Sequence, residues 1–234
     1  MRTKKAKIRS AQRLPSLLNW ALNNYRRFDD TVRKVRHIAE FPPPATAGPT
    51  NELCAKIAYG KLSPSKVAEE VAAIRVEGAR QTAQDVIPVF YREFRRMRAS
   101  GVPELHGSGL PVPIGRRSDG GLLLMPITPN YFVERDGRLI AVFQISWTSV
   151  LLKPFQTDLL SSIIQLEFLS QAQFANADAE VWCFPRMKRS LARDFSYWNV
   201  RDYATMSRDD IQRQFRLYSE AVRNVVSYFE VQAD

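Results

Sequence analysis

The chain offers few residues that could do chemistry, and two of the most informative lie near its middle. Gln144 and Ser146 interrupt the apolar run RLIAVFQISW, which occupies residues 138–147. Residues two apart in a β-strand point to the same face, so the Gln144 amide and the Ser146 hydroxyl are predicted to lie side by side. Both groups form hydrogen bonds, but neither carries a charge. Because Mg²⁺ prefers carboxylate oxygens, this pair favours binding over metal-dependent catalysis.

The elements around this pair predict a small sheet. Asp136-Gly137 separates two strand-like segments, 131–134 and 138–147, and glycine accepts the positive φ that a tight hairpin turn requires. Gly78 or Pro88 is predicted to interrupt the preceding helix. The remaining predicted elements are helices at 66–98 and 155–174, strands at 110–114, 122–127 and 180–184, and a Gly- and Pro-rich loop over 101–121.

The order of these elements is helix, three strands, helix, strand. It predicts an α/β or α+β fold, in which a small mixed sheet with a central antiparallel hairpin is flanked by helices. A chain of 234 residues is long enough to bury a substantial core.

From about residue 66 to residue 184, this order resembles the core of the restriction-endonuclease-like PD-(D/E)xK nucleases. The resemblance implies a metal site with an acidic residue near the start of the second core strand, often after a proline. A second acid and a lysine, two residues apart near the end of the third strand, complete the site. The corresponding positions here are Asn130, which follows Pro129, and the pair Gln144 and Ser146.

These differences from the nuclease motif argue against catalysis. Asparagine, glutamine and serine supply neither the carboxylates nor the fixed positive charge that the nuclease site uses. Glu93, on the preceding helix, occupies a position where many family members keep an additional acid. The degenerate site candidates are therefore Glu93, Asn130, Gln144 and Ser146, and no metal or other cofactor is expected. Mg²⁺ would be required only if the protein were an active nuclease.

Positive charge is the strongest signal of a partner. The net charge is +10 and the isoelectric point is about 9.9, a balance that favours anionic partners such as nucleic acid. Arginines also match the geometry of phosphate oxygens, although a charged run is often only a solvated helix face. The candidate nucleic-acid contacts are Lys4, Lys5, Lys7, Arg92, Arg95, Arg96, Arg116, Arg117, Arg186, Lys188 and Arg189.

Both ends of the chain predict helices with a heptad pattern of apolar residues. One helix is predicted to run from Leu14 to Ala39, and the other from Ser207, with apolar residues from Ile211 to Phe229. These helices either pack on each other or bind a second subunit or protein partner. The predicted organisation is a basic flexible arm over 1–12, a helix and Pro-rich linker over 13–45, and an α/β core with a C-terminal helix over 46–234.

Three functions remain open from the sequence. The leading hypothesis is a nucleic-acid-binding protein whose nuclease-like core has lost catalysis. The alternative is a regulatory or structural protein-interaction module that forms a dimer or binds a partner through its heptad helices. The third is a metal-dependent nuclease whose active site has migrated to Glu93 and another acid such as Glu134, Asp158 or Glu167.

The location is predicted to be cytoplasmic and away from membranes. No apolar run approaches the roughly 20 residues that a membrane span needs, and the N-terminus lacks the apolar segment of a secretory signal. The two cysteines, Cys54 and Cys183, lie far apart and form no CxxC motif. They are therefore expected to be buried thiols rather than a disulfide or a zinc site.

Overall fold

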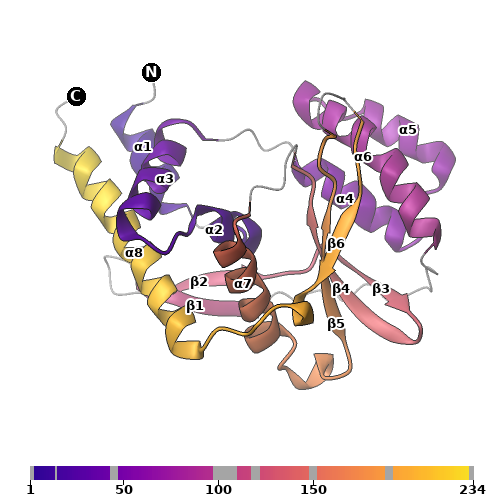
Figure 1. Ribbon diagram of the computed structural model, residues 1–234. Coiled ribbons are helices and arrows are strands. Elements are labelled where there is room, and N and C mark those ends of the chain that lie inside the picture. Colours follow the sequence, from indigo (N-terminus) through magenta and orange to yellow (C-terminus); the bar gives the residue numbers. More distant parts are fainter. Residues whose placement is uncertain are drawn as a thin grey trace.

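The fold is mixed α/β, as the sequence predicts, and its centre is a four-stranded sheet in the order β3-β4-β5-β6 (Figure 1). The computed structural model describes residues 3–13, 15–42, 47–96, 110–116, 122–147, 152–187 and 192–231. The strands are β1 (Leu110–Arg116), β2 (Leu122–Ile127), β3 (Tyr131–Arg135), β4 (Arg138–Ile145), β5 (Asp178–Cys183) and β6 (Ser196–Asn199). The helices are α1 (Lys4–Gln12), α2 (Leu17–Asn23), α3 (Phe28–Glu40), α4 (Ala47–Ala58), α5 (Pro64–Ala72), α6 (Glu77–Arg96), α7 (Pro154–Ile163) and α8 (Arg208–Val231).

The predicted hairpin is confirmed. Strands β3 and β4 pair antiparallel, and the turn between them places Asp136 at φ 52° and Gly137 at φ 74°. Glycine has no Cβ to clash in this left-handed region, which explains why it ends the turn. Strand β4 then pairs in parallel with β5, and α7 lies in the connection between them. Strand β6, which the sequence did not predict, pairs antiparallel with β5.

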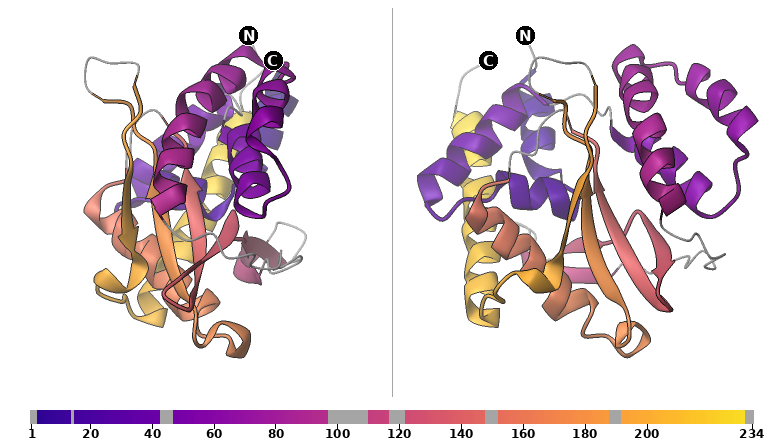
Figure 2. Two further views of the ribbon diagram at one scale, coloured as in Figure 1. Left: turned by 90° about the vertical axis from the view of Figure 1, so that its right-hand side faces the viewer. Right: turned by 45° about the vertical axis from the view of Figure 1, so that its right-hand side comes forward.

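The sheet separates two hydrophobic cores, because alternate residues of each strand face opposite sides. On one face, side chains such as Tyr131, Val142 and Trp182 pack against α4, α5 and α6. On the other face, side chains such as Phe143 and Val181 pack against α7, α8 and the N-terminal helices. Figure 2 shows these helices on the opposite side of the sheet from α4, α5 and α6. Strands β1 and β2 form a separate two-stranded sheet on this second side, so β2 is not part of the main sheet.

The N-terminal segment differs from the prediction. The sequence predicts a flexible arm over residues 1–12, but Lys4–Gln12 form α1, which contacts both α3 and α8. Lys4 Nζ donates to the Glu230 carbonyl at the end of α8, 2.9 Å away, so the two chain ends lie close together (Figure 1). The Lys7 ammonium lies 5.3 Å from the centre of the Phe229 ring. These contacts give the lysines a structural role that a solvated arm would not have.

The long helix predicted from Leu14 is two helices, α2 and α3. The break falls at residues 24–27, where side chains replace the helical hydrogen bonds that are lost. Gln156 Nε2 donates to the carbonyls of Leu22 and Asn24, at 2.8 and 2.9 Å, and thereby satisfies acceptors at the end of α2. Thr31 Oγ1 accepts from the Tyr25 amide at 3.1 Å, which fixes the turn into α3.

The two heptad patterns meet within the chain. Helix α3 packs along α8, and Val35 and Ala39 are buried with Ile211 and Phe229 in one core. Trp20 of α2 joins the same core, with its ring 4.9 Å from that of Phe215. The N-terminal helices therefore share a core with the sheet rather than standing apart from residues 46–234. Part of the predicted linker, residues 43–46, lies outside the described residues.

Two other helix predictions need correction. The break predicted near Gly78 or Pro88 instead falls at residues 73–76, between α5 and α6, and Pro88 lies inside α6. The side chain of Pro88 is exposed, so its ring does not disrupt the core. The helix predicted over 155–174 ends its α-helical part at Ile163 and continues as a π-helical turn, Ile164–Phe168.

Candidate functional site

The predicted polar residues meet at the ends of β3 and β4. Asn130 immediately precedes β3, and Gln144 and Ser146 lie at the end of β4. A set of hydrogen bonds joins them to two residues of α4. We call this set the polar cluster, and its members are Asn51, Cys54, Asn130, Tyr131, Gln144 and Ser146.

Gln144 is the centre of the polar cluster. Its Oε1 accepts from the Tyr131 hydroxyl at 2.8 Å, and its Nε2 donates to Ser146 Oγ at 2.8 Å and to Cys54 Sγ at 3.3 Å. Ser146 Oγ in turn donates to Asn51 Oδ1 at 2.6 Å. Both donor hydrogens of the Gln144 amide are therefore used. Because Gln144 and Ser146 are only 1% and 2% exposed, these hydrogen bonds replace those with water.

Asn130 joins the polar cluster through the backbone. The Asn130 side-chain Oδ1 accepts from the backbone N–H of Gln144 at 2.5 Å. The backbone N–H of Asn130 donates to the Val142 carbonyl at 2.7 Å. Glu93, the fourth candidate, is not a hydrogen-bond partner of Asn130, Gln144 or Ser146; it pairs with Arg92 at 2.7 Å. The structure thus brings three of the four degenerate-site candidates together and leaves the carboxylate out.

The polar cluster carries no ionised oxygen. Burial raises the pKa of the Cys54 thiol to about 12, although its hydrogen bond from Gln144 acts in the opposite direction. Burial also raises the pKa of the Tyr131 hydroxyl well above its usual value. A divalent cation needs charged or free carbonyl oxygens, and here the amide oxygens already accept hydrogen bonds. The donor set therefore does not fit Mg²⁺.

The carboxylates proposed for a migrated site do not form a metal centre. In the part of the chain that the structure describes, no group of three or more His, Cys, Asp or Glu residues is placed to hold a metal ion. Glu167 instead pairs with Arg208, with 2.8 Å between Oε1 and Nη1.

An arginine pair lies next to the polar cluster, at the carboxyl ends of the parallel strands β4 and β5. Arg193 Nη1 donates to the carbonyls of Trp147 and Phe184, at 2.8 and 2.9 Å, and these residues lie two positions after the end of β4 and one position after the end of β5. Arg186 faces Arg193 across an isolated β-bridge. Arg186 Nη2 donates to Asp85 Oδ2 of α6 at 2.9 Å, and Arg193 Nε lies 3.9 Å from the same oxygen.

The arginine pair carries one positive charge more than Asp85 neutralises. The Arg193 side chain is fully buried, and its Nε and Nη2 atoms have no hydrogen-bond partner among the residues that the structure describes. Burial lowers the pKa of Arg193, while the charge of Asp85 raises it. Arg186 Nε is likewise buried without a partner in the described part of the chain, but the Arg186 side chain as a whole is 32% exposed. Solvent therefore reaches the arginine pair at Arg186.

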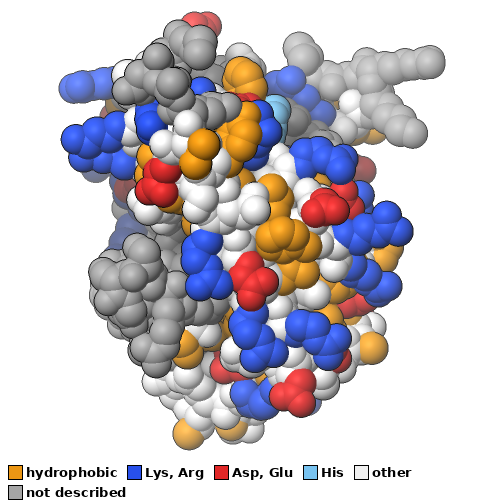
Figure 3. Space-filling model, turned by 90° about the vertical axis from the view of Figure 1, so that its left-hand side faces the viewer, with side chains coloured by type: hydrophobic (Ala, Val, Ile, Leu, Met, Phe, Trp, Pro, Cys, Tyr) orange, Lys and Arg blue, Asp and Glu red, His pale blue; other side chains and the backbone are white. Residues whose placement is uncertain are grey.

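The other predicted cations are spread over the surface. Lys5 is exposed on α1, and Arg92 and Arg95 are exposed on α6. On the face formed by α1, α3 and α8, Lys and Arg side chains alternate with Asp and Glu, and hydrophobic side chains run along the middle (Figure 3). The other candidate cations are not described by the structure. Arg117, Lys188 and Arg189 lie outside the described residues, and the side chains of Arg96 and Arg116 are not described either.

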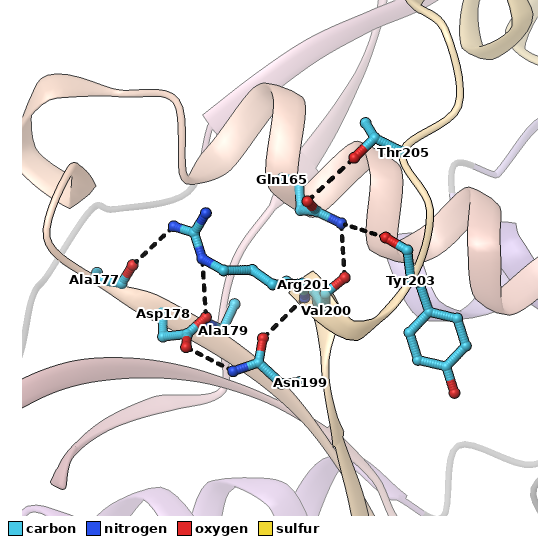
Figure 4. Close-up of polar contacts among 9 residues, drawn as sticks. All are labelled: Gln165, Ala177, Asp178, Ala179, Asn199, Val200, Arg201, Tyr203 and Thr205. Carbon is cyan, nitrogen blue, oxygen red and sulfur yellow. Dashed lines mark hydrogen bonds and ion pairs between the residues drawn. The ribbon is translucent and has the colours of Figure 1, made fainter.

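Sequence reasoning missed a polar network around the turn after β6 (Figure 4). Gln165, in the π-helical turn, donates to the Val200 carbonyl at 2.6 Å. Asp178 of β5 accepts from Asn199 Nδ2 at 2.6 Å and lies 3.4 Å from Arg201 Nε. These contacts join residues from separate elements and connect the turn to β5 and to the π-helical turn that follows α7. No motif or spacing in the sequence marks them.

Comparison with known proteins gives no match for this chain. The chain matches no protein family, no curated protein and no solved structure. Among the described residues, no helix is both long and apolar enough to cross a membrane.

Proposed function

We propose that this protein binds nucleic acid through its phosphates and does not cleave it. One observation carries the proposal: an arginine pair with excess positive charge lies beside a polar cluster without ionised oxygens. Both lie at the carboxyl ends of β4 and β5, the edge where sheets with parallel strands commonly bind ligands. Arginine donates bidentate hydrogen bonds to phosphate oxygens, whereas phosphate cleavage by a bound metal needs carboxylates that are absent from the polar cluster.

The overall charge and the order of elements support the same function. A net charge of +10 attracts a polyanion over distances longer than a hydrogen bond. From α6 the chain order is β1, β2, β3, β4, α7, β5, and β1 and β2 lie outside the main sheet, so the resemblance to PD-(D/E)xK nucleases is supported only by the β3–β4 hairpin, α7 and the parallel strand β5. We infer a nuclease-like core in which the metal-binding positions have become a structural hydrogen-bond network.

Binding through the heptad helices has less support as a function. The apolar faces of α3 and α8 pack on each other and on α1, so they are buried within the chain. A partner or a second subunit would have to displace this packing to use them.

Fluorescence anisotropy with labelled single- and double-stranded DNA and RNA oligonucleotides tests the proposal. The affinity should fall when salt rises from 50 to 200 mM, by roughly tenfold if two phosphates are contacted. Arg186→Gln should weaken binding by about threefold to tenfold. The control is Arg216→Gln, which removes an exposed arginine on α8 that is not among the candidate contacts. Incubation with Mg²⁺ or Mn²⁺ should leave plasmid DNA intact.

Two results would reject the proposal. One is an affinity that does not change over this salt range, because phosphate contacts release bound counterions. The other is metal-dependent cleavage that persists through purification, since the polar cluster offers no site for it.

A further inference from the structure

Strands β5 and β6 continue as a paired ribbon beyond their assigned ends. The register that pairs these strands also holds at the bridge between Arg186 and Arg193. Backbone hydrogen bonds of 2.9 and 3.0 Å, one on either side of this bridge, extend the pairing. We call residues 182–187 and 192–199 the ribbon. It carries the arginine pair near one end and β6, an outer strand of the main sheet, at the other.

One face of the ribbon combines cations with aromatic rings. Side chains along a strand alternate between faces, so Arg193, Phe195 and Tyr197 share one face. Arg186 lies on the same face, because it is paired with Arg193 across the bridge. The distance along the strand from Arg193 to Tyr197 is about 13 Å, at about 3.3 Å per residue. Positive charge and aromatic rings therefore follow one another along a single surface.

The rings on this face lead from the core to the solvent. Trp182 and Phe184 are fully buried, and the centre of the Phe195 ring lies 5.4 Å from the centre of each of their rings. The Tyr197 ring stacks on Phe195, with 5.8 Å between centres and 28° between planes, yet Tyr197 is 49% exposed. The buried rings hold Tyr197 in place while about half of its surface stays in water. A half-exposed ring on such a rigid base suits stacking with an unpaired nucleic-acid base.

The neighbouring Arg135 borders the Tyr197 ring and leaves it open to solvent. The Arg135 guanidinium lies 5.4 Å from the ring centre, whereas that of Arg36 lies 3.9 Å from the centre of Tyr228 in a close stack. Arg135 donates to both carboxylate oxygens of Glu180, at 2.7 and 3.1 Å. Since Glu180 neutralises Arg135, the excess positive charge on this face comes from the arginine pair.

A single strand of nucleic acid suits this face better than a duplex. In a duplex each base is paired and stacked between its neighbours, so a protein side chain reaches its ring face only if the base is flipped out. In a single strand the bases are free to turn onto aromatic rings, while the phosphates follow positive charge. The ribbon offers these two contacts side by side.

We propose that the ribbon binds single-stranded nucleic acid, with a base stacked on Tyr197 and a phosphate of the same strand at Arg186. This inference rests on the proposed function and adds the class of nucleic acid to it. Because every base has an aromatic face, the contact selects unpaired strands without reading their sequence.

Fluorescence anisotropy on the full chain compares labelled probes of about 20 nucleotides: oligothymidylate, an abasic strand with the same phosphates, and a duplex of mixed sequence. Oligothymidylate should bind about fivefold or more tightly than the abasic strand, because a single stacked base contributes at least that factor. It should also bind more tightly than the duplex. Oligouridylate is titrated in parallel to distinguish RNA from DNA, and tighter binding of either single strand than of the duplex supports the proposal.

Substitutions at Tyr197 isolate the stacking contact. Tyr197→Leu removes the aromatic face and should lower the affinity for oligothymidylate about fivefold or more, towards that of the abasic strand. Tyr197→Phe keeps the ring and should bind oligothymidylate more tightly than Tyr197→Leu by a similar factor. The matched control is Phe41→Leu, at an exposed ring that ends α3, and it should change the affinity by less than about twofold. Circular dichroism would show that each variant keeps the fold.

The contact at Arg186 should behave differently from the contact at Tyr197. Arg186→Gln removes a phosphate contact, so it should weaken oligothymidylate and the abasic strand by the same factor. The inference alone is overturned if these two strands bind the wild type equally, if the duplex binds as tightly as oligothymidylate, or if Tyr197→Leu and Phe41→Leu behave alike. If no probe binds, the proposed function fails and this inference fails with it.

Discussion

Gln144, at which the proposed nuclease resemblance would place a catalytic acid, belongs to a buried hydrogen-bond network. A buried glutamine with unmet hydrogen bonds would cost about 1–3 kcal/mol per unsatisfied group. Here Tyr131, Ser146 and Cys54 satisfy its side chain, and Asn130 accepts from its backbone amide. The cluster therefore stabilises the junction between the sheet and α4. It has the satisfied, closed character of a core network rather than the open donors of a binding site.

Placing an acid at residue 144 should destabilise the protein. Gln144→Glu removes both amide donors and buries a carboxyl group, so we expect a loss of about 3 kcal/mol or more in the free energy of unfolding. Burial raises the pKa of such a carboxyl above its unfolded value of about 4.3. The unfolded state therefore loses its proton first, and the deficit relative to wild type should grow from pH 5 to pH 8.

Urea unfolding at both pH values measures this loss. Gln212→Glu, at an exposed position of α8, is the matched control and should change stability by no more than about 0.5 kcal/mol. A Gln144→Glu variant as stable as this control would contradict the assignment of Gln144 to a closed network.

The two cysteines should behave as inert thiols in the folded protein. Burial raises the pKa of both Cys54 and Cys183 to about 12, and only the thiolate reacts with disulfide reagents. We expect neither thiol to react with dithiobisnitrobenzoate at pH 8 until urea unfolds the chain. Since an unfolded thiol ionises near 8.5, stability should also fall as the pH rises from about 8.5 towards 12. Equal labelling rates with and without urea would show that the thiols are accessible.

At the scale of elements, the sequence predicted those structures whose signals are local. The Asp136-Gly137 turn, β3, β4 and the start of α8 follow from neighbouring residues. It also predicted that Gln144 and Ser146 share a face. The partners of Gln144 were not predictable, because Cys54 comes from α4, 90 residues away. Helix α1 was missed because its basic composition masks the packing on α3 and α8 that stabilises it.

Pro88 shows that tertiary packing can override a local breaking signal. Proline has no amide to donate to the Gln84 carbonyl, and an interior helical proline typically costs about 3 kcal/mol. Helix α6 nevertheless continues, because Ile87, Phe90 and Phe94 on its buried face pack against the sheet and α4. The free-energy cost of the missing hydrogen bond is smaller at an exposed position such as Pro88, because the Gln84 carbonyl can bind water instead.

Replacing Pro88 by alanine should therefore stabilise the protein. We expect a gain of about 1–3 kcal/mol, because the variant recovers a hydrogen bond and keeps the buried contacts of α6. The control is Pro64→Ala, in the first turn of α5, where proline fits and no comparable gain is expected. Thermal unfolding monitored by circular dichroism compares the two. A lower midpoint for Pro88→Ala would mean that the ring itself contributes packing.

At the scale of the whole molecule, the N-terminal helices complete one core. Trp20, Ala21, Val35 and Ala39 are buried in the same cluster as the sheet, α7 and α8. The centre of the Trp20 ring lies 4.9 Å from that of Phe215 and 5.9 Å from that of Tyr218, so α2 shields these side chains of α8 from solvent. The sequence pattern left two arrangements open, in which the heptad helices pack on each other or bind a second subunit or partner, and it predicted a separate helix and linker over residues 13–45.

Deletion of residues 1–40 should abolish cooperative folding rather than release an independent core. The deletion would expose the apolar faces of α8 and α7 and remove several fully buried side chains. Burial of each of the larger ones contributes about 1.5–3 kcal/mol to the free energy of unfolding. Loss of a single sharp urea transition, followed by tryptophan fluorescence, is the expected result. The double variant Lys5→Gln, Arg9→Gln changes only exposed charges of α1 and should unfold like the wild type. A truncated chain with an unchanged transition would place residues 46–234 in a domain of their own.

The hydrogen bond from Lys4 to the Glu230 carbonyl brings the beginning of α1 beside the end of α8. A short peptide linker could join the two ends, so that the backbone becomes a closed ring. Opening that ring at the turn between α5 and α6, residues 73–76, would give a circularly permuted chain. Such a chain would keep the sheet and both cores, while α5 and α6 would lose the short connection that joins them.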